Sequence, residues 1–237
     1  MDTKTNIKNF YDAQAKNFSL SRKKPWKEFY NILQEIRKYQ KDSINILELG
    51  CGDWRLLDYL KQHLEKQINF TWVDISENMI KLAKEKNPGH TFWAMDMQNF
   101  VEEEQQQKYD VIIMVASFQH IPNKQERLII LKNCYKSLNY EWKLIMVNWA
   151  FTKWFKKKYR KQIILSLLKS LIGLNQINDI YIPWKDPENN TTYQRYYHIF
   201  SGEELNKLLK LAWLIPKSIE FNERNSITIA EKNVIYN

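Results

Sequence analysis

Short apolar runs and amphipathic segments alternate along the middle of the chain, and this alternation constrains the fold more than any other feature. The apolar runs are rich in Ile, Val, Phe and Trp, as buried strands are, and the segments between them have helical periodicity. Strands separated by single helices form a parallel sheet with right-handed crossovers and helices on both faces. The predicted strands are residues 44–49, 70–73, 91–95, 111–115 and 143–147, and the predicted helices are 54–66, 77–86, 98–106 and 124–138.

The two ends of the chain depart from this alternation. The start is predicted to be helical, and Pro25 falls in the first turn of its second helix, where the missing N–H costs little. Near the other end two strands flank a turn-prone stretch, 222–225, and are expected to pair as an antiparallel hairpin. These further elements are helices at 4–16 and 25–40, a basic helix at 154–173, an aromatic-rich loop at 179–200, a helix at 203–212 and strands at 217–222 and 226–230.

Length and composition fit one folded domain. The chain has 237 residues, of which 44% are apolar, including 9 Trp, 13 Tyr and 11 Phe. That is ample material for a packed core and excludes global disorder. The formal net charge of +9 suits an anionic partner, but 29 of the 36 basic residues are Lys, a bias that AT-rich codons also produce. Clustering of the basic residues in one segment would favour an anionic partner over codon bias.

The cysteines and the first residues bear on the cellular setting. Cys51 and Cys134 cannot form a disulfide framework, and neither has metal-ligand spacing with the four histidines. The polar start lacks the apolar core of a secretion signal, and the longest near-apolar run, 163–174, is too short and interrupted to span a bilayer. We therefore expect a cytoplasmic protein without a bound metal, with Cys134 in the core.

Two of the five glycines follow the first predicted strand. They stand in the run E-L-G-C-G at 48–52, where glycine lets the backbone pass close to a ligand. Asp74 lies 22 positions beyond Gly52 at the end of the second predicted strand, where a carboxylate can accept hydrogen bonds from both hydroxyls of a ribose. The alternative is that Asp74 or Ser76 only caps the following helix.

Two further segments complete a family pattern, A-M-D-M at 94–97 and Y-D-V-I-I-M-V-A at 109–116. Together with E-x-G-x-G and Asp74 they resemble the motifs of class I S-adenosylmethionine-dependent methyltransferases. The resemblance implies an α/β, Rossmann-like fold with a seven-stranded sheet, mostly parallel, ending in a C-terminal antiparallel hairpin. We expect a single methyltransferase domain over 1–237, with an N-terminal helical cap at 1–40 and an insertion or lid on the acceptor side at 151–200.

The same resemblance implies cofactor contacts and chemistry. The methyl donor would be S-adenosylmethionine and the product S-adenosylhomocysteine, by an in-line displacement in which the protein supplies alignment and electrostatics. Trp54 stands where the family commonly has a third glycine, which bears on the loop geometry. The implied contacts are Glu48, Gly50 and Gly52 at the methionine part, Asp74 with Ile75 at the ribose, Asp96 and Met97 at the adenine, and Val115 and Ala116 beneath the sulfonium.

The residues after the fourth strand narrow the methyl acceptor. Enzymes that methylate amino groups in DNA usually have Asn or Asp, two prolines and an aromatic residue there, whereas this chain reads S-F-Q-H-I-P at 117–122. Carbon-5 methylation of pyrimidines needs a nucleophilic cysteine on that loop, and neither Cys51 nor Cys134 lies on it. Both reactions are therefore disfavoured.

Two segments resemble those of a narrower group, the tRNA wobble-uridine carboxymethyl methyltransferases. They are F-S-L-S-R-K-K-P-W at 18–26 and Y-Q-R-Y-Y-H-I-F-S-G-E-E-L at 193–205. A carboxylate acceptor needs no strong general base, but it does need cationic donors to position it. By this resemblance Arg195 and His198 face the acceptor, His120 lies on the rim, Arg22 or Lys24 closes over the methionine carboxylate, and Trp26 joins the cofactor site.

Basic residues cluster in the stretch K-W-F-K-K-K-Y-R-K at 153–161, which holds six cations and three aromatic residues. Cations contact phosphates and rings stack on unpaired bases, so tRNA is the expected partner. Two alternatives remain, because the apolar stripe that follows can lie on an anionic membrane or cover the active site as a lid. The cations are Lys153, Lys156, Lys157, Lys158, Arg160 and Lys161, and the stripe is Ile163, Ile164, Leu167, Leu168, Leu171 and Ile172.

Other interpretations of the whole chain stay open. In one, Tyr196, Tyr197 and Phe200 only pack, and Arg195 lies on a solvated face. The enzyme alternatives are a small-molecule or lipid methyltransferase of the same fold. A non-catalytic scaffold that binds RNA or a partner is disfavoured by the intact acidic and glycine motifs. The similar eukaryotic tRNA enzymes work with a small zinc-binding partner, so a small activating subunit is a further expectation.

Overall fold

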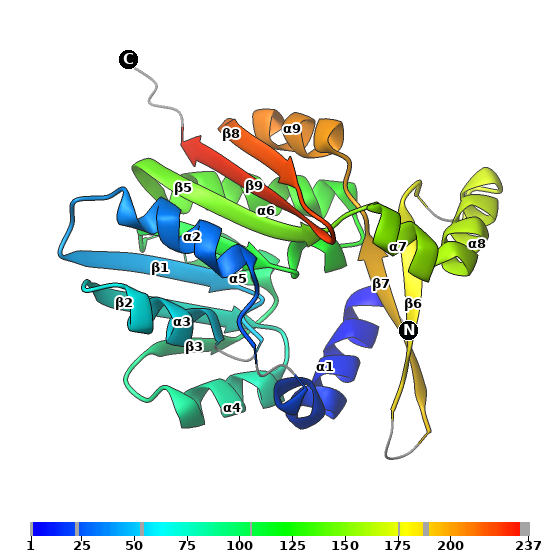
Figure 1. Cartoon of the computed structure of the whole chain (residues 1–237), viewed down its shortest axis with the longest axis horizontal. Coiled ribbons are helices and arrows are strands. Elements are labelled where there is room, and N and C mark those ends of the chain that lie inside the picture. The colour runs from blue at the N-terminus through cyan, green and yellow to red at the C-terminus, as the bar shows by residue number, and fades with distance from the viewer. Residues whose placement is uncertain are drawn as a thin grey trace.

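The computed structural model describes residues 2–21, 24–52, 55–104, 106–174, 176–186 and 190–232. Its centre is a seven-stranded sheet in the order β3-β2-β1-β4-β5-β9-β8 (Figure 1). The first five strands are parallel, and β9 pairs antiparallel with both β5 and β8, which confirms the predicted sheet. The strands are β1 (Ser43–Leu49), β2 (Gln67–Asp74), β3 (Thr91–Ala94), β4 (Tyr109–Val115), β5 (Leu138–Trp149), β8 (Leu214–Phe221) and β9 (Asn225–Lys232).

The central strands are buried on both faces. Six of the seven residues of β4 are buried, and β1 and β2 each end in an unbroken buried run. A strand covered on both sides needs apolar residues at every position, so these segments read as continuous apolar runs rather than as alternating ones. The burial therefore accounts for the pattern that predicted the sheet.

Helices cover both faces of the sheet (Figure 1). α2 packs with α3 on one face, whereas α6 packs with α5 and α9 on the other. Cys134 of α6 is fully buried, and burial raises the pKa of its thiol to about 12, as befits a core residue. These helices are α1 (Thr3–Leu20), α2 (Glu28–Arg37), α3 (Arg55–His63), α4 (Glu77–Lys86), α5 (Met97–Glu103), α6 (Lys124–Ser137) and α9 (Gly202–Leu211), with a 3-10 turn η1 (Phe118–His120).

The segment after β5 differs from the prediction in two ways. The expected loop at 179–200 contains an antiparallel hairpin of β6 (Asp179–Lys185) and β7 (Thr192–His198), which forms a separate two-stranded sheet. Aromatic and β-branched residues favour strands, and β6 tolerates Pro183 because it pairs with β7 alone. The expected single basic helix is two helices, α7 (Lys153–Lys158) and α8 (Arg160–Leu171), which meet at Tyr159.

A second, smaller apolar core joins α7 to this hairpin. Phe155 and Tyr159 pack with Ile180, Ile182 and Tyr197, and Trp149 at the end of β5 lies against them. Trp149 stacks on Tyr197 with ring centroids 4.7 Å apart. The insertion is therefore anchored to the main sheet through the end of β5. Throughout the described part of the chain, every helix is too short or too polar to span a lipid bilayer.

Candidate active site

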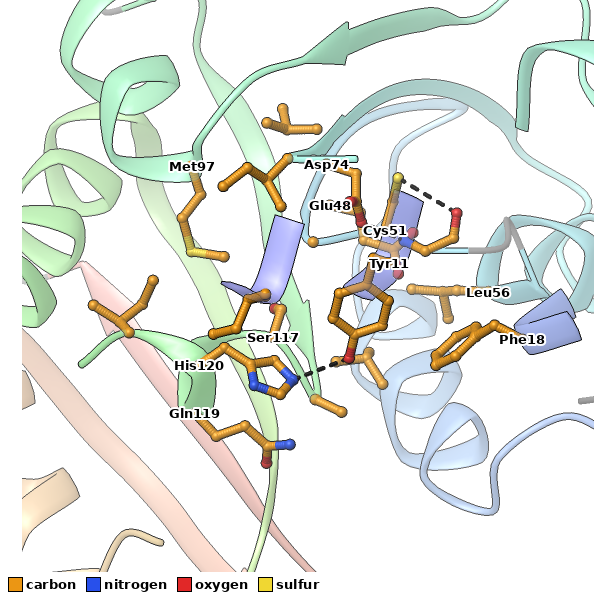
Figure 2. A pocket seen from close by; sticks show the side chains of 18 of the residues that line it. Tyr11, Phe18, Glu48, Cys51, Leu56, Asp74, Met97, Ser117, Gln119 and His120 are labelled. Atoms are coloured by element: carbon orange, nitrogen blue, oxygen red, sulfur yellow. Dashed lines mark hydrogen bonds between the residues drawn. The ribbon is translucent and has the colours of Figure 1, made fainter. Parts of the chain in front are cut away.

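A cavity opens at the carboxyl ends of β1, β2 and β4 (Figure 2). The chain runs outward in opposite directions from β1 and β4, and ligands of open α/β sheets bind at such a switch point. Residues at the ends of these strands and in the loops that follow them line the cavity. Helix α1 also contributes to the wall, through Lys4, Ile7, Tyr11 and Phe18.

The glycine turn after β1 packs closely against Ser117, the second residue after β4. Gly50 has φ +76°, and a Cβ placed on it would lie 2.2 Å from the Cβ of Ser117. The Ser117 hydroxyl donates a hydrogen bond to the backbone oxygen of Leu49 at 2.6 Å, which holds the two segments together. Gly52 has φ +56° and faces only the edge of Phe18 at 3.9 Å. Steric exclusion therefore requires glycine at Gly50, and backbone conformation favours it at Gly52.

Asp74 ties the end of β2 to this turn. Its carboxylate accepts hydrogen bonds from the backbone N–H of Gly52 and of Ser76, each at 2.9 Å. The cap of α4 is instead Ser76, whose hydroxyl accepts from the N–H of Met79 at 3.2 Å. Burial raises the pKa of Asp74 to about 6. Asp74 therefore lines the cavity, and Ser76 rather than Asp74 caps α4.

The structure brings most of the expected cofactor residues together at this cavity. Asp96 also caps α5, because its carboxylate accepts from the N–H of Gln98 at 3.0 Å, and it pairs with Lys4 of α1 at 3.4 Å. Arg22 lies outside the described residues, and Lys24 is not on the wall. The expected residues that do line the cavity are Glu48, Gly50, Gly52, Asp74, Ile75, Asp96, Met97, Val115, Ala116 and Trp26.

His120 and Tyr11 meet at the cavity wall, where His120 lies beside Ser117 (Figure 2). The His120 Nδ1 lies 2.7 Å from the backbone oxygen of Tyr196, which can only accept, so Nδ1 carries a proton. In the neutral ring Nε2 then accepts from the Tyr11 hydroxyl at 3.1 Å. The Tyr197 ring lies 4.6 Å from the His120 ring and also lines the cavity. The expectation that His120 lies at this site agrees with its position.

Arg195 and His198 occupy other places than expected, because neither lines the cavity. Side chains alternate along a strand, so Arg195 and Tyr197 share one face of β7 whereas Tyr196 and His198 share the other. Of these four side chains, that of Tyr197 is the one that lines the cavity. The Arg195 guanidinium lies behind it, 5.3 Å from its ring and 5.0 Å from the rings of Phe10 and Trp184.

His198 belongs to a buried polar network that joins the hairpin to α6 and α9. Its Nδ1 lies 2.7 Å from the Asp179 carboxylate, and its Nε2 lies 2.9 Å from that of Glu204. Arg127, which is fully buried, donates to the Tyr196 hydroxyl at 3.0 Å and pairs with Glu204 at 3.6 Å. The Tyr196 hydroxyl in turn donates to Asp179 at 2.7 Å. This network positions the hairpin, and it accounts for the burial of His198.

Helix α1 connects the cofactor side to the hairpin. Asp12 accepts a hydrogen bond from the Ser76 hydroxyl at 2.7 Å, and Lys8 pairs with Glu77 at 3.4 Å, both at the start of α4. Two residues beyond Asp12, the Gln14 side chain donates to Asp186, which follows β6. The wall residues contributed by α1 were not predicted from the sequence, because nothing local in a polar helix indicates which distant segment it contacts.

The expected lid is absent from the cavity wall. No residue of α7 or α8 lines the cavity, although Trp149 just before them does. Helix α8 lies at the side of the molecule far from α2 and α3, and α7 lies between it and the main sheet (Figure 1). Helix α8 packs on β6, and Phe155 of α7 packs on the hairpin and on Trp149, so both helices contact the insertion rather than the cavity wall.

Known proteins share this architecture. Residues 47–141 match the family model described as a methyltransferase domain. A solved S-adenosylmethionine-dependent methyltransferase from Methanosarcina mazei is similar in fold, with a TM-score of 0.66 and 21% identity over 84% of this chain and 97% of that one. Other solved methyltransferases of this fold contain S-adenosylmethionine or S-adenosylhomocysteine. The chain is therefore a methyltransferase that uses S-adenosylmethionine as its cofactor.

Within that class the chain is similar to two enzymes with different acceptors. It is 23% identical over 247 residues to the tRNA (carboxymethyluridine(34)-5-O)-methyltransferase of Schizosaccharomyces pombe, with 96% of each chain covered. It is also 36% identical over 111 residues to the malonyl-[acyl-carrier protein] O-methyltransferase of Bacillus cereus, which covers 46% of this chain and 38% of that protein. The chain thus spans nearly all of the first relative and little more than a third of the second.

Proposed function

We propose that the protein methylates a carboxymethyl group on a modified wobble uridine of tRNA. The similarity to the Schizosaccharomyces pombe enzyme supports this acceptor, because it extends along the whole chain, well beyond the domain match at 47–141. Both relatives are named for O-methylation of a group that carries a free carboxylate, carboxymethyl in one and malonyl in the other, so a carboxylate acceptor is the chemistry that the two names share. The cofactor would leave as S-adenosylhomocysteine.

The cavity residues suit the cofactor in charge and shape. A buried carboxylate at Asp74 can accept hydrogen bonds from ribose hydroxyls, and Gly52, where a Cβ would meet a described atom no nearer than 3.9 Å, leaves room for the methionine part. Met97 and Val115 supply apolar surface for the adenine and the sulfonium. When bound, the cofactor supplies an activated methyl carbon, and the chain holds the acceptor oxygen in line with it.

One observation carries the proposal of an anionic acceptor. Arg195 is 5% exposed, its Nε makes no hydrogen bond with a described residue, and among those residues it has no ion pair. Three aromatic rings compensate the buried charge in part. A buried cation favours a nearby anion strongly, and the Arg195 guanidinium lies 5.3 Å from the centroid of the Tyr197 ring, which lines the cavity. We therefore assign Arg195 as a positioning residue that attracts the acceptor carboxylate.

The carboxylate itself acts as the nucleophile, so the site needs no strong general base. His120, with Nδ1–H donated to Tyr196, and the Tyr11 hydroxyl form a polar pair on the cavity wall. This pair is placed to orient the acceptor by hydrogen bonds. In-line transfer then depends on alignment more than on proton movement.

The tRNA contact and the activating subunit are parts of the same proposal. All six cations of the basic stretch are exposed, as phosphate contacts require, and Lys158 lies 4.9 Å from the Trp154 ring. Binding of tRNA that weakens steeply with salt, and weakens further when Lys157 and Lys158 become Glu, would support this contact. A subunit would be revealed by activity that the purified chain gains when it is expressed with its natural partner.

The acceptor is tested by labelled methyl transfer from S-adenosylmethionine to two substrates in parallel. These are tRNA carrying carboxymethyluridine and malonyl-acyl-carrier protein. Arg195→Ala should abolish transfer to tRNA and leave cofactor affinity unchanged, whereas the exposed Arg224→Ala serves as the control. Transfer to the malonyl carrier alone would replace the proposed acceptor, and full activity of Arg195→Ala would remove that residue from the site.

A further inference from the structure

Helix α8 buries polar side chains and exposes apolar ones, which is the reverse of the usual pattern for a helix packed on a protein. Its buried residue is Ser166, whose hydroxyl donates a hydrogen bond to the backbone oxygen of Asp179, and the half-buried Gln162 and Ser170 share that inner side. Ile163 is the apolar residue that packs inward. The apolar side chains that face solvent are Ile164, Leu165, Leu167, Leu168 and Leu171, followed by Ile172, Leu174 and Ile177.

The exposure of these side chains is large. Leu171 is 81% exposed, Ile172 71%, and the others between 49% and 68%. Single exposed apolar residues are common on protein surfaces, but a continuous apolar face on one helix marks an interaction site. A surface helix normally turns such a face toward the core, so α8 requires another apolar environment to cover it.

The charge around this face identifies that environment. Residues 151–178 contain seven Lys or Arg and no Asp or Glu. Arg160 and Lys161 begin the helix, and Lys156 to Lys158 lie just before it, all exposed. A second copy of the chain would bring the same cations together, which opposes pairing through this face. RNA would satisfy the cations but leave the apolar side chains in water.

We propose that α8 lies on an anionic membrane surface, with its apolar face in the boundary between headgroups and acyl chains. Leucine and isoleucine side chains enter that boundary, while the flanking lysines contact anionic headgroups. The helix is too short and too polar to span, so the contact is peripheral. Because α8 does not line the cavity, the docked protein keeps its active site open. The proposal does not depend on the acceptor proposed above.

Co-sedimentation of the full chain with vesicles tests this docking. One vesicle is phosphatidylcholine alone, and the other contains equal parts of phosphatidylcholine and phosphatidylglycerol. We expect the protein to bind the anionic vesicles, with an affinity at least about tenfold above that for the neutral ones. Salt should weaken the binding without abolishing it, because the apolar contribution remains.

Two variants separate the apolar face from other surfaces. Leu168→Glu with Leu171→Glu should lower vesicle affinity by about tenfold or more, since two side chains no longer enter the boundary. Leu211→Glu, at a 47% exposed position on α9, is the matched control and should bind as the unmodified protein does. An unchanged affinity for S-adenosylmethionine confirms that the double variant is folded.

Several results would overturn the proposal. The chain binding neither vesicle, or the double variant binding as strongly as the control, would exclude docking through α8. Self-association that the double variant loses, without vesicle binding, would assign the face to a second copy. Vesicle binding that depends on Lys157 and Lys161 but not on Leu168 and Leu171 would reduce the contact to charge alone.

Discussion

The Asp74 carboxylate accepts a hydrogen bond from the backbone N–H of Gly52 at 2.9 Å, so the end of β2 holds the turn that follows β1. The second carboxylate oxygen accepts from the N–H of Ser76, also at 2.9 Å. One side chain therefore fixes both loops at the carboxyl edge of the sheet and adds a negative charge to the cavity. The side chain that holds the two loops is also the one that we propose to bind the ribose of the cofactor.

Asp74→Asn should weaken cofactor binding. The carboxylate can accept from two ribose hydroxyls, and hydrogen bonds to charged groups contribute about 1.5–3 kcal/mol each, so we expect a loss of tenfold to a hundredfold in affinity for S-adenosylmethionine, measured by calorimetry. In the unmodified protein the affinity should also fall as pH drops through about 6, where Asp74 takes up a proton. Glu77→Gln, an exposed carboxylate on α4, is the control and should keep full affinity.

The same titration predicts the pH dependence of stability. The pKa of Asp74 is raised in the folded protein from 3.8 to about 6, so the folded state binds the proton more tightly than the unfolded state. This stabilisation is complete below about pH 4 and is lost as pH rises through about 6. Relative to Asp74→Asn, the unmodified protein should lose up to about 3 kcal/mol of unfolding free energy over that range. Parallel pH dependences in urea denaturation would contradict the assignment.

Alanine substitutions at three glycines with positive φ distinguish the effect of a steric clash from that of backbone strain. Gly50→Ala should lower the free energy of unfolding by about 3 kcal/mol or more, because its Cβ would overlap Ser117. Gly52→Ala and Gly89→Ala meet no such clash and should each cost about 1–2 kcal/mol. Only the changes at Gly50 and Gly52 should also weaken cofactor binding. Equal losses of stability at all three positions would argue against the close approach of the two loops.

The contact between Tyr11 and His120 predicts a selective kinetic defect. Tyr11→Phe removes a hydroxyl within 3.1 Å of the His120 Nε2 and keeps the ring, so the acceptor kcat/KM should fall by about tenfold. Stability and cofactor affinity should change little. Tyr30→Phe, at a 59% exposed position on α2, is the control. An unaltered kcat/KM in Tyr11→Phe would place the pair outside the acceptor site.

The network under the hairpin predicts a stability defect instead. Arg127→Met leaves the carboxylates of Asp179 and Glu204 without the guanidinium that pairs with them at 3.9 Å and 3.6 Å. Removing one partner of a buried ion pair costs about 3–5 kcal/mol, which thermal or urea unfolding would detect. Arg37→Met, at an exposed position, should cost less than about 1 kcal/mol. A small effect in Arg127→Met would show that the hairpin is held by its apolar core.

Much of the fold and the cofactor side follows from local sequence. Buried parallel strands need apolar residues throughout, so β1, β2 and β4 are visible as runs, and the residues at their ends are then known to meet at one edge. Asp74 and the glycine pair were predicted on that basis. Asp74 and the glycine pair are far apart in the sequence, and they lie close together because β1 and β2 are neighbours in the sheet.

The acceptor side was harder to predict for physical reasons. The segment 179–200 was predicted as a loop, and without strands there was no alternation to show that His198 lies on the opposite face of β7 from Tyr197, which lines the cavity. Tyr11 contacts His120 across 109 positions, and its helix carries no local mark of that contact. The outward apolar face of α8 was visible as a stripe, but only the structure shows that it is not folded over the cavity.

The central claim is tested most directly by the nucleosides of tRNA from cells with and without this protein. Methyl esters of carboxymethyluridine at the wobble position should be present with the protein, absent without it and restored by the unmodified gene. They should not be restored by Gly50→Ala or Arg195→Ala. Identical amounts of the methyl ester in both strains would contradict the account.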